Sequence, residues 1–195
     1  FGPEKQKSKL MKLGFSLQTT FAIFMMVFLA SCVGGKLTKN TANLQPDGKH
    51  EKISKAFFLQ YSVKINIEAT PEEIWSILTD AENYTDWNST VVSLEGEIAE
   101  GEKINLVSTV DTSRSFSIKI TTADKPRKIL KKDGIGGVFR GVRKYLLTPQ
   151  DDGTTDFMMS EVLAGYVLAF VKKKLPDFGE SFEQYAVDLK KRAEN

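Results

Sequence analysis

The sequence predicts an α+β domain in which a curved antiparallel sheet of about seven strands wraps around one long C-terminal helix. Apolar and polar residues alternate in short segments between residues 57 and 164, and two short helical segments follow the first of these strands. The end of the chain instead repeats apolar residues every three or four positions, which is typical of an amphipathic helix. Consecutive strands joined by short turns pair antiparallel, and the helix is the element that covers the apolar face of the sheet.

The first strand and the helix after it have the clearest local signals. Every second residue from 57 to 67 is apolar, which predicts a strand with one buried face. Thr70 can cap a helix, Pro71 suits the first helical position, and Glu73 completes a capping box. A helix is therefore expected to begin at Pro71 and to end near Asp80. A second short helix or turn is expected over residues 81–88.

The remaining elements are predicted from the same two spacings of apolar residues, every second residue in strands and every third or fourth residue in helices. Further strands are predicted around residues 92–98, 104–110, 116–120, 128–132, 138–148 and 155–164. Apolar residues then recur at helical spacing from Leu168 to Leu189. Pro176 lacks an amide hydrogen and crowds the preceding turn, so it should interrupt that helix. We expect a first piece ending near Leu175 and a main helix from Pro176 to about Glu194.

Composition and charge exclude several classes of protein. The chain has 195 residues, of which 41% are hydrophobic and 27% charged, as in an ordinary globular protein. Its formal net charge is +2, but the part from Cys32 onward carries 23 basic and 24 acidic residues. A nearly neutral body argues against nucleic-acid binding. With one histidine, His50, and one cysteine, the usual zinc and iron–sulfur sites are excluded. We therefore expect no metal, no cofactor and a monomer.

The first 31 residues have the organisation of a secretory signal peptide. The sequence begins with Phe1 instead of methionine, and Met11 is the better candidate start. A basic region precedes an apolar run over residues 21–30, and small residues follow it. That run is shorter than the roughly 20 residues that a transmembrane helix needs.

The end of this segment resembles a bacterial lipoprotein signal. Leu29, Ala30, Ser31 and Cys32 match that motif, which implies cleavage before Cys32 and attachment of lipid to it. The alternative is an ordinary signal, or an uncleaved anchor, in which Cys32 is incidental. The residue directly after Cys32 is Val33, not an acidic residue, so the outer membrane is favoured, with the domain outside the cytoplasm. Residues 32–54 lack periodicity and are interpreted as a flexible tether, with His50 as a solvated residue of it.

The domain from Lys55 to Asn195 resembles the START-like superfamily, also called SRPBCC. The resemblance begins with IEATPEEIW at residues 67–75 and continues with Leu78-Thr79-Asp80 and the Tyr84, Trp87 and Asn88 pattern. It extends through GVFRG at 137–141, LTP at 147–149, DGT at 152–154, and Glu161 before Ala164-Gly165, to the closing helix. The match is to the CoxG-like and polyketide-cyclase-like branch. It implies a helix-grip fold with a ligand cavity between the sheet and the C-terminal helix.

The candidate site residues are those that this fold would place around such a cavity. Glu161 lies on a mixed face of its strand, so it either pairs with Arg140 or Arg143 or lines a polar end of the cavity. Trp75 is expected in the core, whereas Tyr84 and Trp87 fit core and pocket mouth equally well. The residues expected to line the cavity are Tyr84, Trp87, Phe116, Ile118, Phe139, Arg140, Arg143, Tyr145, Met159, Glu161, Phe178, Phe182 and Tyr185.

Three functions are compatible with these features. The favoured one is a membrane-anchored lipoprotein that binds or carries a hydrophobic small molecule or lipid. The second is an enzyme of the cyclase or hydrolase type that uses Glu161, Arg140, Arg143 and Tyr145. His50 lies outside the predicted domain and Cys32 lies in the lipid motif, so no Ser-His-Asp or Cys-His set can be built, which weakens this alternative. The third is a domain with a filled core that acts only as an interaction module in the cell envelope.

Overall fold

A computed structural model describes residue 41, residues 43–135 and residues 138–195. The predicted signal peptide, Cys32 and the first part of the predicted tether lie outside the described residues. In chain order the elements are β1 (Asp47–Lys55), β2 (Phe58–Ile67), α2 (Pro71–Thr79), α3 (Tyr84–Trp87), β3 (Val91–Glu95), β4 (Lys103–Ser108), β5 (Asp111–Asp124), β6 (Lys128–Ile135), β7 (Phe139–Pro149), β8 (Thr155–Ala164), α4 (Leu168–Val171), the 3₁₀-helix η3 (Lys172–Lys174) and α5 (Gly179–Ala193).

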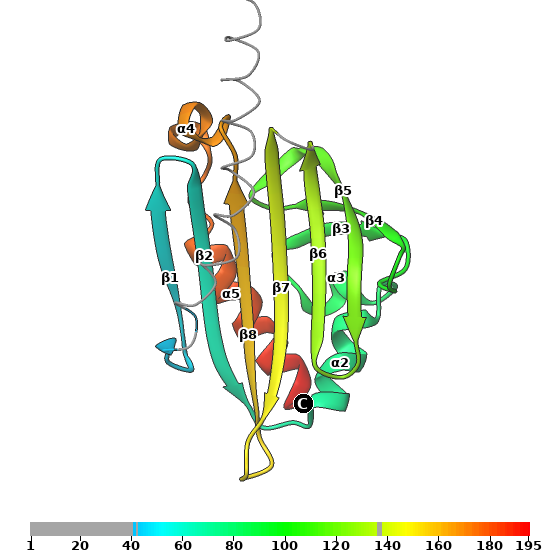
Figure 1. Cartoon of the computed structure of the whole chain (residues 1–195). Helices are drawn as coiled ribbons and strands as arrows, with labels where there is room; N and C mark the ends of the chain where they lie inside the picture. The colour runs from blue at the N-terminus through cyan, green and yellow to red at the C-terminus, as the bar shows by residue number, and fades with distance from the viewer. Residues whose placement is uncertain (1–40, 42, 136–137) are drawn as a thin grey trace, which may run out of the picture. The chain divides into compact units, whose positions relative to one another are not determined.

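The strands form one antiparallel sheet in the order β1-β2-β8-β7-β6-β5-β4-β3. The sheet curls, so that β3 and β4 lie behind the other strands in Figure 1, and α5 runs across the concave side. The described residues therefore have the predicted α+β architecture of a helix-grip fold. The sheet has eight strands where about seven were predicted.

The additional strand is β1, which occupies residues that were predicted to belong to the tether. It pairs antiparallel with β2, with Lys52 opposite Tyr61. His50 was interpreted as a solvated linker residue, and that interpretation was wrong. Its backbone N–H donates to Glu183 of α5 at 3.1 Å, and its Nδ1 lies 2.9 Å from the same carboxylate. Because β1 is an edge strand with few buried residues, it lacks the alternation that would reveal it in the sequence.

The corner between β2 and α2 forms as its sequence predicts. The Thr70 side chain accepts a hydrogen bond from the Glu73 N–H at 3.3 Å, and the Glu73 carboxylate accepts one from the Thr70 N–H at 2.8 Å. These two bonds satisfy donors that a helix start otherwise leaves unpaired. Trp75 is buried in the core, as predicted. The corner thereby fixes the position of α2 near one end of α5.

Helix α5 covers the sheet with one apolar stripe. Phe182, Tyr185, Ala186 and Leu189 recur at helical spacing and are all buried. The helix begins at Gly179, three residues later than predicted, so Pro176 lies in the preceding non-helical segment. The segment from 168 to 174 forms only α4 and η3, which agrees with the expected interruption.

Candidate functional site: a cavity between the sheet and the C-terminal helix

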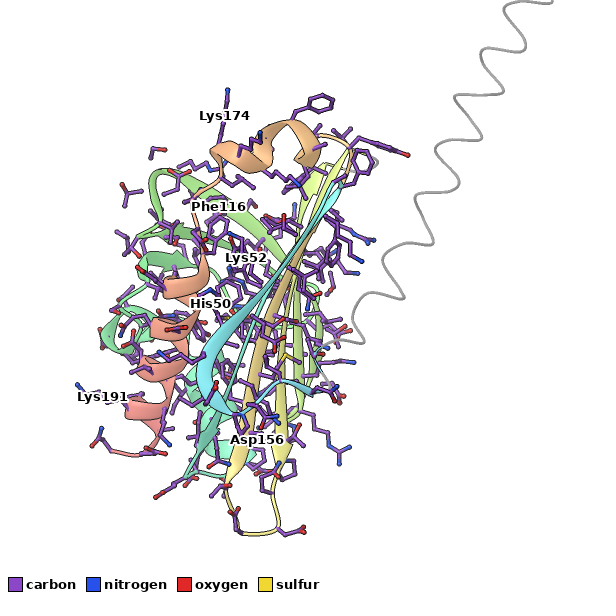
Figure 2. The ribbon with its side chains drawn as sticks, turned by 90° about the vertical axis from the view of Figure 1, so that its left-hand side faces the viewer. His50, Lys52, Phe116, Asp156, Lys174 and Lys191 are labelled. Atoms are coloured by element: carbon purple, nitrogen blue, oxygen red, sulfur yellow. The ribbon has the colours of Figure 1, made fainter. Side chains whose placement is uncertain are left out.

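A cavity of about 150 Å³ lies between the inner face of the sheet and α5. Strands β3 to β8 supply one wall, and α5 with residues 175–178 supplies the other. Figure 2 shows Phe116, which lines this cavity, in the half of the domain nearer Lys174 of η3. The volume is below the range of roughly 300–1,000 Å³ that is typical for drug-sized ligands. The cavity therefore fits a small ligand, or one end of a longer one.

Most of the residues predicted from the sequence line this cavity. Its apolar lining comes from β3, β4, β5, β7, β8 and the α5 region, and its charged residues come from β5, β6, β7 and β8. The predicted residues that line it are Phe116, Ile118, Phe139, Arg143, Tyr145, Met159, Glu161, Phe178, Phe182 and Tyr185. Their role in binding a ligand stays a prediction.

Three of the predicted residues lie elsewhere. Tyr84 is fully buried beneath the cavity, where its hydroxyl lies 2.6 Å from the hydroxyl of Tyr185. Trp87 packs with its ring centroid 4.9 Å from the Tyr84 ring and 5.5 Å from the Tyr185 ring, so it supports the wall from behind. Arg140 is exposed, because residues of one strand alternate between its two faces and Arg143 takes the inner one. The prediction that these three line the cavity was wrong.

The strand register places three charged residues in one row across the inner face. Lys131 of β6 lies opposite Arg143 of β7, and Arg143 lies opposite Glu161 of β8. Arg143 donates from Nε to Oε2 of Glu161 at 2.9 Å, and a second guanidinium nitrogen bonds the same oxygen. Of the two pairings open to Glu161, the structure therefore has the one with Arg143. The pair also lines the cavity, so both interpretations of Glu161 hold together.

The Arg143 guanidinium is held in its charged form. Burial disfavours its charge, but the Glu161 carboxylate outweighs this effect and raises the pKa of Arg143 above its ordinary value. The guanidinium carbon also lies 5.2 Å from the centroid of the Phe182 ring of α5. This contact is a cation–π interaction that joins the polar row of the sheet to the helix.

Lys131 is a buried cation that the sequence analysis did not select. Only 3% of the residue is exposed, and its Nζ lies 4.9 Å from the ring centroid of Tyr145 and 5.4 Å from that of Tyr84. Burial lowers its pKa, and the positive charge of Arg143 acts in the same direction. Among the described residues no carboxylate forms an ion pair with it, since the opposite Arg143 takes the row's only carboxylate.

Three buried phenols surround this row, and their pKa values diverge. Burial raises the pKa of Tyr84 and of Tyr185 well above the ordinary value. Burial acts in the same way on Tyr145, but the Lys131 ammonium and the Arg143 guanidinium outweigh it and lower the pKa of that phenol. Tyr145 is thus the phenol of this group that most readily gives up its proton.

Asp133 is a second charged residue of β6 that the sequence analysis missed. It lies opposite Gly141, and a Cβ at position 141 would lie 1.8 Å from its Oδ1. Burial, followed by the nearby Glu161 charge, raises the pKa of Asp133. The available signal was the alternation of Ile129, Lys131 and Asp133, which assigns all three side chains to one face of β6.

The cavity has a charged rim and a neighbouring hollow. At the rim, Arg114 donates to Asp111 at 2.9 Å and lies 4.3 Å from the centroid of the Phe116 ring. A separate hollow of about 310 Å³ lies on the other side of Leu175 and Pro176, which line both spaces. The smaller cavity is the better candidate site, because it alone contains the buried charged row.

The described residues place two limits on other kinds of site. They contain no group of three or more His, Cys, Asp or Glu side chains that could hold a metal ion. No described helix combines the length and the apolar composition that crossing a membrane requires.

Comparison with known proteins identifies the family. The model of the family described as polyketide cyclase / dehydrase and lipid transport matches residues 59–194. The chain belongs to this family, and therefore to the START-like class that the sequence motifs indicated. At the level of the family, the fold with its cavity is that of a ligand-binding domain. No curated protein is significantly similar to this chain.

Solved structures agree with this assignment of the fold. A START superfamily protein from Mycobacterium smegmatis is 19% identical, with a TM-score of 0.52; the match covers 69% of this chain and 97% of that one. A truncated norcoclaurine synthase from Thalictrum flavum is 13% identical, with a TM-score of 0.54 and coverage of 72% and 97%. A conserved protein of unknown function from Enterococcus faecalis is 14% identical, with a TM-score of 0.55 and coverage of 77% and 80%. At these identities the similarity shows the fold alone.

Proposed function

We propose that this chain is a bacterial lipoprotein whose START-like domain binds a hydrophobic small molecule or lipid between the sheet and α5. The observation that carries this proposal is the cavity itself, which combines apolar walls with a buried row of charged side chains. Removing apolar ligand surface from water contributes about 25 cal/mol per Å². The few polar groups would fix the orientation of the ligand, as is general for small-molecule sites.

Native mass spectrometry of the purified full chain tests the binding proposal. We expect a stoichiometric adduct that is released on denaturation and can be identified after extraction. A chain that carries no adduct, and binds no environment-sensitive hydrophobic dye, would contradict the proposal and favour an interaction module with a filled core. A variant that fills the cavity, Phe116→Trp, should displace the adduct. The control variant Val92→Trp, at an exposed site, should retain it.

The proposed membrane anchor requires its own test. The motif that ends at Cys32 supports lipid attachment, and residues 33–46 would then separate the domain from the membrane surface. Metabolic labelling with an alkyne fatty acid should label the wild-type chain and not the Cys32→Ser variant. Equal labelling of both chains, or of neither, would contradict the anchor and leave the ligand-binding proposal unaffected. Fractionation of the labelled cells would then test the outer-membrane location.

A second candidate function is acid–base catalysis on the bound ligand. It is favoured by the Tyr145 phenol, which faces two cationic side chains inside the cavity and has a lowered pKa. Such a phenol gives up its proton to a ligand more readily than an ordinary tyrosine does. Conversion of the extracted ligand by the wild-type chain, lost in Tyr145→Phe while binding persists, would support catalysis. Binding without conversion in both chains would leave the carrier function.

A further inference from the structure

The row of charged side chains on the inner face has one more positive charge than it can pair. Lys131 and Arg143 lie directly opposite each other on neighbouring strands, and like charges in that arrangement destabilise a sheet. Glu161 is the carboxylate of this row, and two guanidinium nitrogens of Arg143 are bonded to it. Within the described chain, the Lys131 ammonium is thus left without an ionic partner.

The other acidic residues near the cavity are held in place by other groups. Asp133 lies against the backbone of Gly141, two register positions farther along β6, and forms no ion pair with Lys131. Asp111 is paired with Arg114 at the rim. The groups that do approach Lys131 are the rings of Tyr84 and Tyr145 and the hydroxyl of Tyr145. Aromatic rings and a neutral hydroxyl attract a cation far more weakly than a carboxylate does.

A buried ammonium without a counter-ion is costly, so a group that supplies the missing negative charge gains affinity from it. Lys131 lines the cavity, and its amino group offers hydrogen-bond donors but no acceptor. The apolar wall formed by Phe116, Ile118 and Phe178 belongs to the same cavity. A ligand that satisfies both regions has one negative charge and an otherwise apolar body.

We propose that the cavity binds an organic acid, with its carboxylate against Lys131 and its apolar body against Phe116, Ile118 and Phe178. This inference rests on the proposed ligand-binding function and specifies the chemical class of the ligand. One ammonium matches one carboxylate, and the Tyr145 hydroxyl lies beside it as an additional donor. The volume of about 150 Å³ favours a body of one aromatic ring or a medium-length alkyl chain.

Calorimetric titration of the full chain at pH 7 tests this assignment with matched probes. Decanoate is compared with 1-decanol for an alkyl body, and 3-phenylpropanoate with 3-phenyl-1-propanol for an aromatic one. We expect at least one acid to bind about tenfold or more tightly than its alcohol, the ratio that one charge-assisted hydrogen bond supplies. Whichever pair shows this preference identifies the body as alkyl or aromatic.

Two variants assign the preference to Lys131. In Lys131→Met the acid should bind no more tightly than the alcohol, while the alcohol keeps its wild-type affinity. Lys132→Met removes a charge from the exposed neighbour on the same strand and should keep the preference. Circular dichroism and the urea midpoint establish that Lys131→Met is folded, which is expected because it removes a buried, unpaired charge.

The outcomes separate this inference from the function on which it rests. Alcohols that bind as tightly as acids, or a preference that persists in Lys131→Met, would overturn the carboxylate assignment and leave hydrophobic binding intact. A chain that binds none of the four probes and carries no native adduct would overturn both proposals.

Discussion

The pair of Arg143 and Glu161 offers a stability prediction whose magnitude follows from the structure. The two side chains are 29% and 20% exposed, and they face a cavity rather than the outer surface. Removing one partner of a fully buried pair costs about 3–5 kcal/mol, because the other charge stays behind without compensation. Partial contact with the cavity should reduce this cost, so we expect Glu161→Leu to lose about 2–3 kcal/mol of unfolding free energy.

The two single variants should differ in size. Glu161→Leu leaves the Arg143 guanidinium without its partner, and an arginine cannot give up its charge. Arg143→Met should lose only about 1–2 kcal/mol, because the remaining Glu161 carboxylate still has the positive charge of Lys131 nearby.

The double variant completes the cycle. With both charges replaced by apolar side chains, the row no longer contains an unpaired ion of this pair. We expect Arg143→Met/Glu161→Leu to lie within about 1 kcal/mol of the wild type, with a coupling energy of about 2 kcal/mol or more. Arg114→Met is the matched control, because its partnership with Asp111 is more exposed, at 60% and 33%, and should be worth at most about 1 kcal/mol.

Urea unfolding followed by circular dichroism measures these differences, provided that the slope m stays constant across the variants. A loss below about 0.5 kcal/mol in Glu161→Leu would show that water in the cavity solvates Arg143 fully. A double variant as unstable as the sum of the two single variants would show that the two side chains do not act as a pair. Either result would refute the reasoning.

Three further predictions concern other parts of the domain. Gly141→Ala should lose about 1–3 kcal/mol in urea unfolding, because its Cβ would meet Asp133, and Asp133→Ala should restore most of that loss. Thr70→Ala should lose about 1 kcal/mol by the same assay, whereas Thr70→Ser should retain the cap. The pKa of Glu183 lies below 4.5, chiefly because its carboxylate accepts a hydrogen bond from the backbone N–H of His50. The ionised carboxylate therefore stabilises the folded domain above that pH, and this stabilisation is lost as the pH falls further. Glu183→Gln should therefore be less stable at pH 7 and show a flatter acid decline of the urea midpoint; an unchanged decline would contradict the role of this carboxylate.

The parts of the fold that the sequence could predict are those fixed by local patterns. The alternation of β2 and the capping box at Thr70 each involve a few neighbouring residues, and both formed as expected. β1 escaped prediction because it is polar on both faces and owes its existence to pairing with β2 and to the contact of His50 with Glu183. Such partners are distant in the sequence and leave no local period.

The candidate site was predictable to a similar extent. Alternation identified the inner faces of β7 and β8, but only the register between strands showed that Glu161 meets Arg143 rather than Arg140. Lys131 was overlooked because a lysine between polar neighbours resembles a solvated side chain. Tyr84 has the same local sequence signal whether it faces a ligand or supports the wall from below, so packing alone could decide.

The polar composition of β1 determines how the domain can be shortened. The structure places its lysines, among them Lys49 and Lys52, along one free edge of the sheet, and charged side chains on an edge discourage pairing with other molecules. A chain that starts at Lys55, the predicted domain boundary, would lack this strand and leave β2 as the edge. Because β2 is largely buried and apolar, its unpaired backbone would become a template for association between molecules. A chain starting at Asn43 should therefore stay monomeric under conditions in which one starting at Lys55 aggregates.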